Sequence, residues 1–264
     1  MNCSISNIAW DSELDISVYN LMIKYCFTGL EIAPTRVFPI EPYDTKTGKV
    51  QKWSQDLKEE FGFCVPSIQS IWYGKQEKIF GSPEERKFLT NYTKKAIDFA
   101  ATIGCKNLVF GCPRNRSAPA NFDRDIAISF FRELGDYAAD KGTVIGVEAN
   151  PSIYNTNFIN TTSEALKLIK DVDSAGLLLN LDIGTMIYNR ESISELCGQV
   201  RYISHVHISE PGLKPVEKRH MHKELKQLLS LEKYAGYISI EMTRQENISV
   251  IEGVLNYVKD LFTD

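Results

Sequence analysis

The 264-residue chain lacks paired cysteines and long apolar runs. Its six cysteines are scattered and form no C-x-x-C pair, which disfavours a disulfide scaffold and a cysteine-based zinc site. No apolar run approaches the roughly 18 residues that a membrane span needs, so we predict no membrane association. The N-terminal residues do not form a basic region followed by a hydrophobic one, so we expect no secretory signal and a cytoplasmic protein.

Positive charge is not in excess. The chain has 30 basic and 34 acidic side chains, a net charge of −4 and a pI near 5.7. Nucleic-acid-binding proteins usually carry a strongly basic surface, so these totals predict that nucleic acid is not a partner. The hydrophobic content of 43 % is ordinary for a globular protein with a sizeable core.

The sequence does contain a regular alternation of short apolar runs and longer helical patterns. Eight runs are typical of strands: Cys3–Ala9, Gly29–Ala33, Cys64–Ser70, Asn107–Gly111, Val144–Ala149, Gly176–Asp182, Tyr202–Ile208 and Tyr237–Met242. The stretch from Ser82 predicts a helix, because Ser82, Pro83 and Glu85 form a capping-box pattern and apolar residues follow at helical spacing. Further helical patterns cover 50–61, 130–138, 165–172, 192–196, 224–231 and 254–261.

Eight βα units in roughly 250 residues predict an α/β fold, a (β/α)8 TIM barrel that forms a single domain over residues 1–264. An open doubly wound sheet is the alternative, but no G-x-G-x-x-G motif follows the first strand. No composition shift or Pro/Ser-rich linker divides the chain. A TIM barrel carries its catalytic groups at the carboxyl ends of its strands, so polar residues there are the functional candidates.

Each of the last four predicted strands ends in a polar side chain: Glu148, Asp182, His207 and Glu241. Successive strand residues point to opposite faces, and the apolar neighbours of these four belong on the outside, so all four should point into the barrel. Such a cluster would repel itself and lose its hydration, which a divalent cation resolves. The oxygen-rich donor set predicts one divalent metal ion and favours Mn²⁺, Mg²⁺ or Co²⁺, with Zn²⁺ as the alternative. His205 lies one layer deeper, where we interpret it as a structural or supporting group.

At these residues the chain resembles the xylose isomerase-like TIM barrels, the broad group of sugar phosphate isomerases and epimerases that also includes endonuclease IV. The resemblance extends over nearly the whole chain and is firmest in segments 146–151, 181–184, 205–210 and 238–242. It implies a metal-dependent enzyme that acts on a small-molecule sugar or sugar phosphate.

The spacing of the four polar residues is close to that of the ketose 3-epimerase branch, with intervals of 34, 25 and 34 residues between Glu148, Asp182, His207 and Glu241. In that branch the matching residues bind one metal, and the two glutamates also exchange protons with the substrate. The resemblance therefore implies that all four residues are metal ligands and that Glu148 and Glu241 are catalytic.

Three positions depart from the ketose 3-epimerase pattern. Where that branch has a substrate-binding His, a Glu and an Arg, this chain has Thr185, Tyr154 and Leu213. The resemblance therefore implies the metal site of the ketose 3-epimerases but does not identify the substrate. Endonuclease IV needs several histidines for three zinc ions, whereas this chain has four histidines in all, so the DNA-repair function is disfavoured.

The leading hypothesis is a sugar isomerase or epimerase that moves a proton through an enediolate. The alternatives are a sugar or inositol dehydratase with the same metal site and a barrel that binds sugar without turnover. The superfamily often forms dimers and tetramers, so a homo-oligomer is a possible state.

Further residues at predicted strand ends and on the following loops are candidates for substrate binding: Glu31, Gln69, Trp72, Arg116, Asn150, Tyr154, His222 and Arg244. Glu31 is inward by alternation and could equally form a buried ion pair. Arg116 and Arg244 could hold a substrate phosphate or carboxylate. His222 is expected on a loop that could swing over the mouth.

Overall fold

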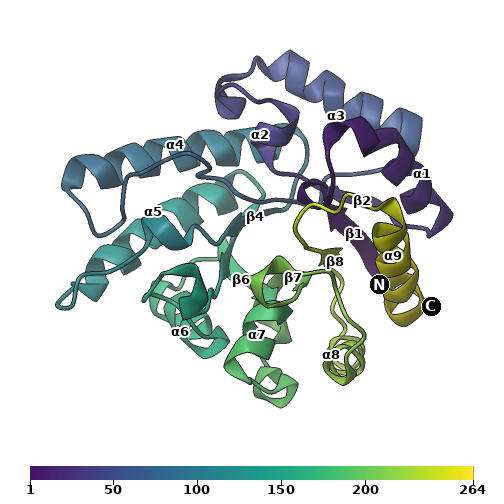
Figure 1. Ribbon diagram of the computed structural model, residues 1–264. Helices are drawn as coiled ribbons and strands as arrows, with labels where there is room; N and C mark the ends of the chain where they lie inside the picture. The colour runs from purple at the N-terminus through teal and green to yellow at the C-terminus, as the bar shows by residue number, and fades with distance from the viewer. Residues whose placement is uncertain (264) are drawn as a thin grey trace.

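Eight short parallel strands lie at the centre of the computed structural model, which describes residues 1–263, and helices surround them (Figure 1). The strands are β1 (Asn2–Ser6), β2 (Gly29–Glu31), β3 (Ser67–Ile68), β4 (Asn107–Phe110), β5 (Val144–Glu148), β6 (Leu177–Asp182), β7 (Ile203–Ile208) and β8 (Tyr237–Ile240). Their order is β2-β1-β8-β7-β6-β5-β4-β3, and isolated bridges from Gly29 to Cys64 and from Ile32 to Ile68 join the two ends. The predicted α/β TIM barrel is confirmed.

The surrounding helices are α1 (Asp15–Lys24), α2 (Pro34–Val37), α3 (Thr47–Phe61), α4 (Pro83–Thr102), α5 (Arg124–Asp140), α6 (Thr162–Val172), α7 (Ile183–Asn189), α8 (His220–Leu231) and α9 (Ile248–Phe262). The capping box of α4 is confirmed, because Ser82 Oγ accepts from the Glu85 N–H and the Glu85 carboxylate accepts from the Ser82 N–H. Helix α8 begins at His220 rather than at Glu224. Within residues 1–263, no helix combines the length and the apolar composition that a membrane crossing requires.

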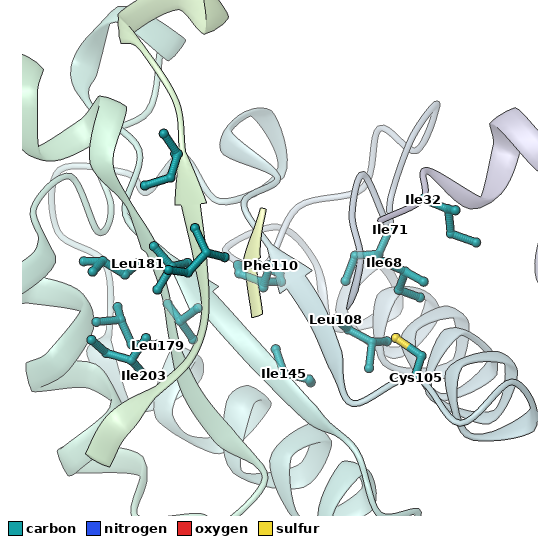
Figure 2. Packing of buried hydrophobic residues seen from close by; sticks show 14 of the residues in the cluster. Ile32, Ile68, Ile71, Cys105, Leu108, Phe110, Ile145, Leu179, Leu181 and Ile203 are labelled. Atoms are coloured by element: carbon teal, nitrogen blue, oxygen red, sulfur yellow. The ribbon is translucent and has the colours of Figure 1, made fainter. Parts of the chain in front are cut away.

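The hydrophobic core lies between the barrel and the helices, and Figure 2 shows part of this layer. Outward-facing strand residues such as Leu108, Phe110 and Ile145 are fully buried there. The Phe110 ring packs edge-on against Trp72 at 4.9 Å and against Phe131 at 4.8 Å. Each such buried side chain contributes roughly 1.5–3 kcal/mol to folding, so this layer fixes the strands whose ends carry the polar groups.

The inside of the barrel, in contrast, is polar. Branched apolar residues fill the interior of many TIM barrels. Here the inward positions hold buried polar side chains, among them Ser6, Glu31, Ser67, Asn107, Asn180, His205, His207 and Ser239. The strand register places Asp182 beside His207, and His207 beside Ser239. Residues from β6, β7 and β8 are thereby brought into one layer.

Candidate metal centre

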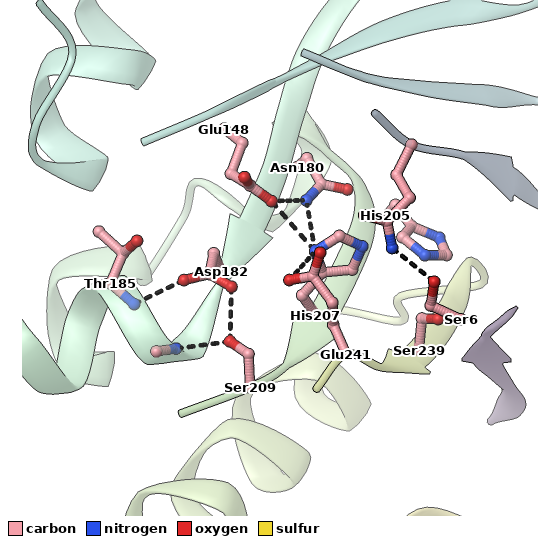
Figure 3. Close-up of polar contacts among 12 residues, drawn as sticks. Ser6, Glu148, Asn180, Asp182, Thr185, His205, His207, Ser209, Ser239 and Glu241 are labelled. Atoms are coloured by element: carbon pink, nitrogen blue, oxygen red, sulfur yellow. Dashed lines mark hydrogen bonds and ion pairs between the residues drawn. The ribbon is translucent and has the colours of Figure 1, made fainter. Parts of the chain in front are cut away.

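The four predicted metal ligands meet at the carboxyl end of the barrel (Figure 3). His207 Nδ1 lies 3.0 Å from Glu148 Oε1 and 3.2 Å from Glu241 Oε2. One ligand atom from each of Glu148, Asp182, His207 and Glu241 lies within 4.8 Å of all the others. The strand alternation was therefore sufficient to predict which side chains converge.

Asp182 is held by the start of the next helix. It is the N-cap residue of α7, and its Oδ1 accepts from the Thr185 N–H at 2.5 Å. Its Oδ2 accepts from Ser209 Oγ, also at 2.5 Å. The position that differs from the ketose 3-epimerase pattern, Thr185, thus orients Asp182 through its backbone, while its hydroxyl donates to the Ala149 carbonyl. Thr185 therefore contacts Asp182 and Ala149 and does not line the space in front of the cluster.

Two amides fix the carboxylate of Glu148. Asn180 Nδ2 donates to Glu148 Oε1 at 2.8 Å, and Asn150 Nδ2 donates to Glu148 Oε2 at 2.9 Å. Gly111 leaves room for the Glu148 carboxylate, because a Cβ at this position would lie 2.8 Å from Glu148 Oε2. Our site prediction did not include Asn180. A polar residue at an inward position of β6, two residues before Asp182, was the signal that could have found it.

The electrostatics of the cluster indicate uncompensated negative charge. Burial, together with the nearby carboxylates, raises the pKa of Glu241 to about 7 and that of Asp182 to about 6. Burial would lower the pKa of His207, but the facing Glu241 and Glu31 carboxylates raise it well above its ordinary value. Three carboxylates with one imidazole form a donor set that suits a divalent cation which prefers oxygen ligands. The residues therefore fit the predicted metal ion.

A cavity of about 190 Å³ opens in front of the cluster. The carboxylates of Glu148, Asp182 and Glu241 line it together with three of the predicted substrate-binding residues, Gln69, Asn150 and Tyr154. Among residues 1–263, the Asn150 Oδ1 atom is buried without a hydrogen-bond partner. Tyr154 Oη accepts from the Gly212 N–H at 3.0 Å and thereby connects the loops after β5 and β7.

Trp72 and Arg116 are not placed at the mouth, which corrects the prediction. Trp72 points outward into the helical layer, where its indole N–H donates to Thr93 Oγ1 at 2.8 Å. The Arg116 guanidinium is fully buried and donates to the backbone carbonyls of Glu148 at 2.7 Å and of Ile159 at 3.2 Å. Arg116 therefore supports the wall behind Glu148 and is not available to hold a substrate anion.

His222 and Arg244 also lie away from the cavity. His222 belongs to helix α8 rather than to a loop, is fully buried, and has its Nδ1 atom 2.9 Å from Tyr257 Oη. It cannot swing over the mouth, because the helix fixes its backbone. Arg244 is exposed and pairs with Asp11 at 3.1 Å.

Glu31 lies beneath the cluster and outside the cavity. Its carboxylate is fully buried, and His207 Nε2 lies 3.0 Å from its Oε1 atom. Burial would raise the pKa of Glu31, but the imidazoles of His207 and His205 hold it well below its ordinary value. The second interpretation of Glu31, a buried ion pair, therefore describes its position.

Comparisons with known proteins place the chain in a family. The sequence model of the family described as xylose isomerase-like TIM barrel matches residues 24–261. No curated protein matches the chain in a sequence search.

Solved structures share the fold over nearly the full chain. A 3-keto-D-glucoside 4-epimerase from E. coli is 20 % identical, with 98 % of this chain and 99 % of that chain covered and a TM-score of 0.78. A D-psicose 3-epimerase from Clostridium cellulolyticum H10 is 15 % identical, with 99 % of both chains covered and a TM-score of 0.78. A sugar phosphate isomerase/epimerase from Parabacteroides distasonis is 13 % identical, with 98 % and 93 % covered and a TM-score of 0.71. At these identities the likeness establishes the fold.

Proposed function

The chain belongs to the xylose isomerase-like TIM barrel family, and on that premise we propose that it is a divalent-metal-dependent sugar epimerase. The observation that carries the proposal is the convergence of Glu148 and Glu241 on one cavity, both within hydrogen-bond distance of His207 Nδ1. Several structures with the same fold are sugar epimerases by name, among them the 3-keto-D-glucoside 4-epimerase and the D-psicose 3-epimerase. They support the reaction class.

The metal ligands would be Glu148, Asp182, His207 and Glu241. A bound divalent cation would supply Lewis acidity that stabilises the negative oxygen formed when a proton leaves the carbon beside a carbonyl. Asn150 and Asn180 hold the Glu148 carboxylate in one orientation toward the cavity. Ser209 and the Thr185 N–H do the same for Asp182.

Proton transfer falls to the two glutamates. Glu148 is the last residue of β5 and Glu241 follows β8, with β6 and β7 between these strands, so their carboxylates approach the cavity from different sides. One carboxylate removes the proton beside the carbonyl, and the other returns a proton to the opposite face, which inverts the carbon. Positioned acid–base groups of this kind contribute roughly 10²–10⁴-fold to a rate.

The charges around the cavity favour an uncharged sugar over a sugar phosphate. The bound cation would offset most of the charge of the three carboxylates that line the cavity, so a substrate phosphate would need a basic side chain of its own. Within the described part of the chain, no Lys or Arg lines the cavity. The two predicted anion-binding residues are engaged elsewhere, Arg116 with backbone carbonyls and Arg244 with Asp11. Asn150, Gln69 and Tyr154 are suited to bind sugar hydroxyls.

Deuterium exchange tests this function. The purified protein with added Mn²⁺ is incubated in D₂O with uncharged keto sugars and with their phosphates, and the products are followed by NMR. We expect deuterium at one inverted carbon of an uncharged sugar, with the rate reduced roughly 10²–10⁴-fold in Glu148→Gln and in Glu241→Gln. Glu217→Gln removes an exposed carboxylate away from the cavity and serves as the control.

Other outcomes would overturn parts of the proposal. An aldose product would identify an isomerase, and loss of a hydroxyl would identify a dehydratase. Turnover of the phosphates alone would contradict the uncharged substrate. Sugar binding without any exchange would identify a binding protein.

A further inference from the structure

A fourth carboxylate, that of Glu31, faces the opposite side of His207, one of the four proposed metal ligands. Glu31 Oε1 lies 3.0 Å from His207 Nε2, whereas His207 Nδ1 faces Glu148 and Glu241. The Glu31 side chain is fully buried and does not line the cavity. It therefore contacts neither the substrate space nor the proposed position of the cation.

The two ring nitrogens of a neutral imidazole have different functions. One carries a proton and donates, and the other carries a lone pair that accepts or binds a metal. An ionised carboxylate only accepts, so Glu31 requires the proton on Nε2. In the neutral ring that binds a cation, the lone pair is then on Nδ1, the atom that faces Glu148 and Glu241.

We propose that Glu31 is a positioning residue of the metal centre, which fixes the tautomer and the ring orientation of His207 so that Nδ1 is free to bind a divalent cation. Carboxylates that orient metal-binding histidines in this way are a general feature of metal sites. The inference rests on the proposed function, because it assigns a role toward the same cation.

The surroundings of Glu31 hold its carboxylate in place. Ser67 Oγ donates to Oε1 at 2.9 Å, and Ser239 Oγ donates to Oε2 at 2.6 Å. Asn107 Nδ2 in turn donates to Ser67 Oγ at 3.0 Å. Glu31 is thus tied to β3, β4 and β8 in addition to His207 on β7. Hydroxyl and imidazole donors already occupy its oxygens, so a second cation at Glu31 is disfavoured.

The experiment measures metal affinity rather than turnover. Glu31→Gln keeps the shape of the side chain but removes its charge and one acceptor oxygen. We expect the affinity for Mn²⁺, measured by competition with a chromogenic chelator, to fall roughly 10–100-fold. Glu31→Asp, which keeps a carboxylate, should recover part of this loss. Glu210→Gln is the matched control, because Glu210 is also buried but pairs with Arg219 outside the cluster. The Mn²⁺ affinity of this variant should equal that of the unaltered protein.

A measurement on the unaltered protein keeps the inference testable if the variants do not fold. In the Zn²⁺-loaded protein, ¹⁵N NMR of the histidines should show a proton on His207 Nε2 and a metal on Nδ1. A proton on Nδ1, or equal Mn²⁺ affinities for Glu31→Gln and the unaltered protein, would overturn the role of Glu31 and leave the proposed function intact. Failure of the unaltered protein to bind any divalent cation would instead overturn the proposed function, and the role of Glu31 with it.

Discussion

The two sides of the His207 ring face different carboxylate environments. The upper layer consists of Glu148, Asp182 and Glu241 on the Nδ1 side, and all three line the cavity. The lower layer consists of Glu31 with its serine donors on the Nε2 side, and Glu31 is 0 % exposed. One imidazole therefore connects an acidic cluster that lines the cavity with a carboxylate that lies outside it.

The comparison shows what distinguishes a reactive carboxylate from a structural one in the same barrel. In the lower layer, hydroxyl and imidazole donors surround Glu31. Burial alone would raise its pKa, but the imidazoles of His207 and His205 together hold the pKa well below the ordinary value. In the upper layer, burial among like charges raises the pKa of Glu241 to about 7. The lower layer is thus satisfied by the protein, whereas the upper layer has charge left for a cation and a substrate.

Removal of the shared ring should have the largest effect. His207→Ala removes one metal ligand and also leaves Glu31 as a buried charge without its nearest imidazole partner, which costs roughly 3–5 kcal/mol in the free energy of unfolding. Urea unfolding and metal content measure the two losses. His220→Ala is the control, since His220 is exposed and 3.7 Å from Glu224. Unchanged unfolding of His207→Ala would contradict the connection between the layers.

Substitution of Arg116, which supports the wall behind the upper layer, should lower the stability of the protein. It should not change the preference between charged and uncharged sugars. Arg116→Ala removes the donors to the buried carbonyls of Glu148 and Ile159, at a cost of about 1–3 kcal/mol for each carbonyl. Chemical denaturation measures the loss. A selective decrease in the binding of phosphorylated sugars, with unchanged stability, would instead place Arg116 in the substrate pocket.

The pH dependence of stability should have opposite signs in the two layers. The raised pKa values of Glu241, about 7, and Asp182, about 6, mean that the folded metal-free protein binds protons that the unfolded chain releases above about pH 4. This stabilisation is present below about pH 4 and is lost as the pH rises through 6 and 7. The raised pKa of His207 acts in the same direction. Glu31, whose pKa is lowered, loses its contribution only as the pH falls well below 4.5.

We therefore expect the Tm of the chelator-treated protein to fall between about pH 5 and pH 8 and to recover at pH 8 when Mn²⁺ is added. Glu241→Gln, which cannot ionise, should weaken this dependence and raise the Tm of the metal-free protein at pH 8. Differential scanning fluorimetry at a series of pH values provides the measurement. A metal-free Tm that rises over this range would contradict the electrostatics of the upper layer.

The smallest effect is expected for Arg244, the other arginine that was predicted to bind a substrate anion. Arg244→Ala breaks an exposed ion pair with Asp11 and should change the free energy of unfolding by less than about 1 kcal/mol. Steady-state kinetics should be unaffected, since Arg244 does not line the cavity. A marked rise in KM would show that the loop after β8 reaches the substrate.

Regular strands made part of this site predictable. Alternation along β5–β8 was enough to place Glu148, Asp182, His207 and Glu241 inward, because a strand has only two faces. The same argument placed Glu31 inward but could not separate a substrate contact from a buried partner of His207. That distinction depends on depth along the barrel axis, which comes from the register between strands rather than from one strand's sequence.

The irregular segments were the less predictable part. Trp72 and Arg116 follow β3 and β4 on loops without a repeating side-chain direction, so closeness to a strand end did not reveal where they point. The segment before residue 224 is polar and shows no apolar periodicity, so the first turn of α8 was not predicted. His222 lies in this turn and belongs to the helix rather than to a mobile loop. Asn180 did follow the alternation, and its amide character was the available signal for a partner of Glu148.

Elemental analysis of the purified protein, before and after incubation with Mn²⁺, Co²⁺ or Zn²⁺, tests the central claim most directly. We expect about one divalent ion per chain, reduced in Glu148→Gln and lost in His207→Ala, because both residues belong to the upper layer. A protein that retains none of these ions under any of these conditions would contradict the assignment of the upper layer as a metal centre.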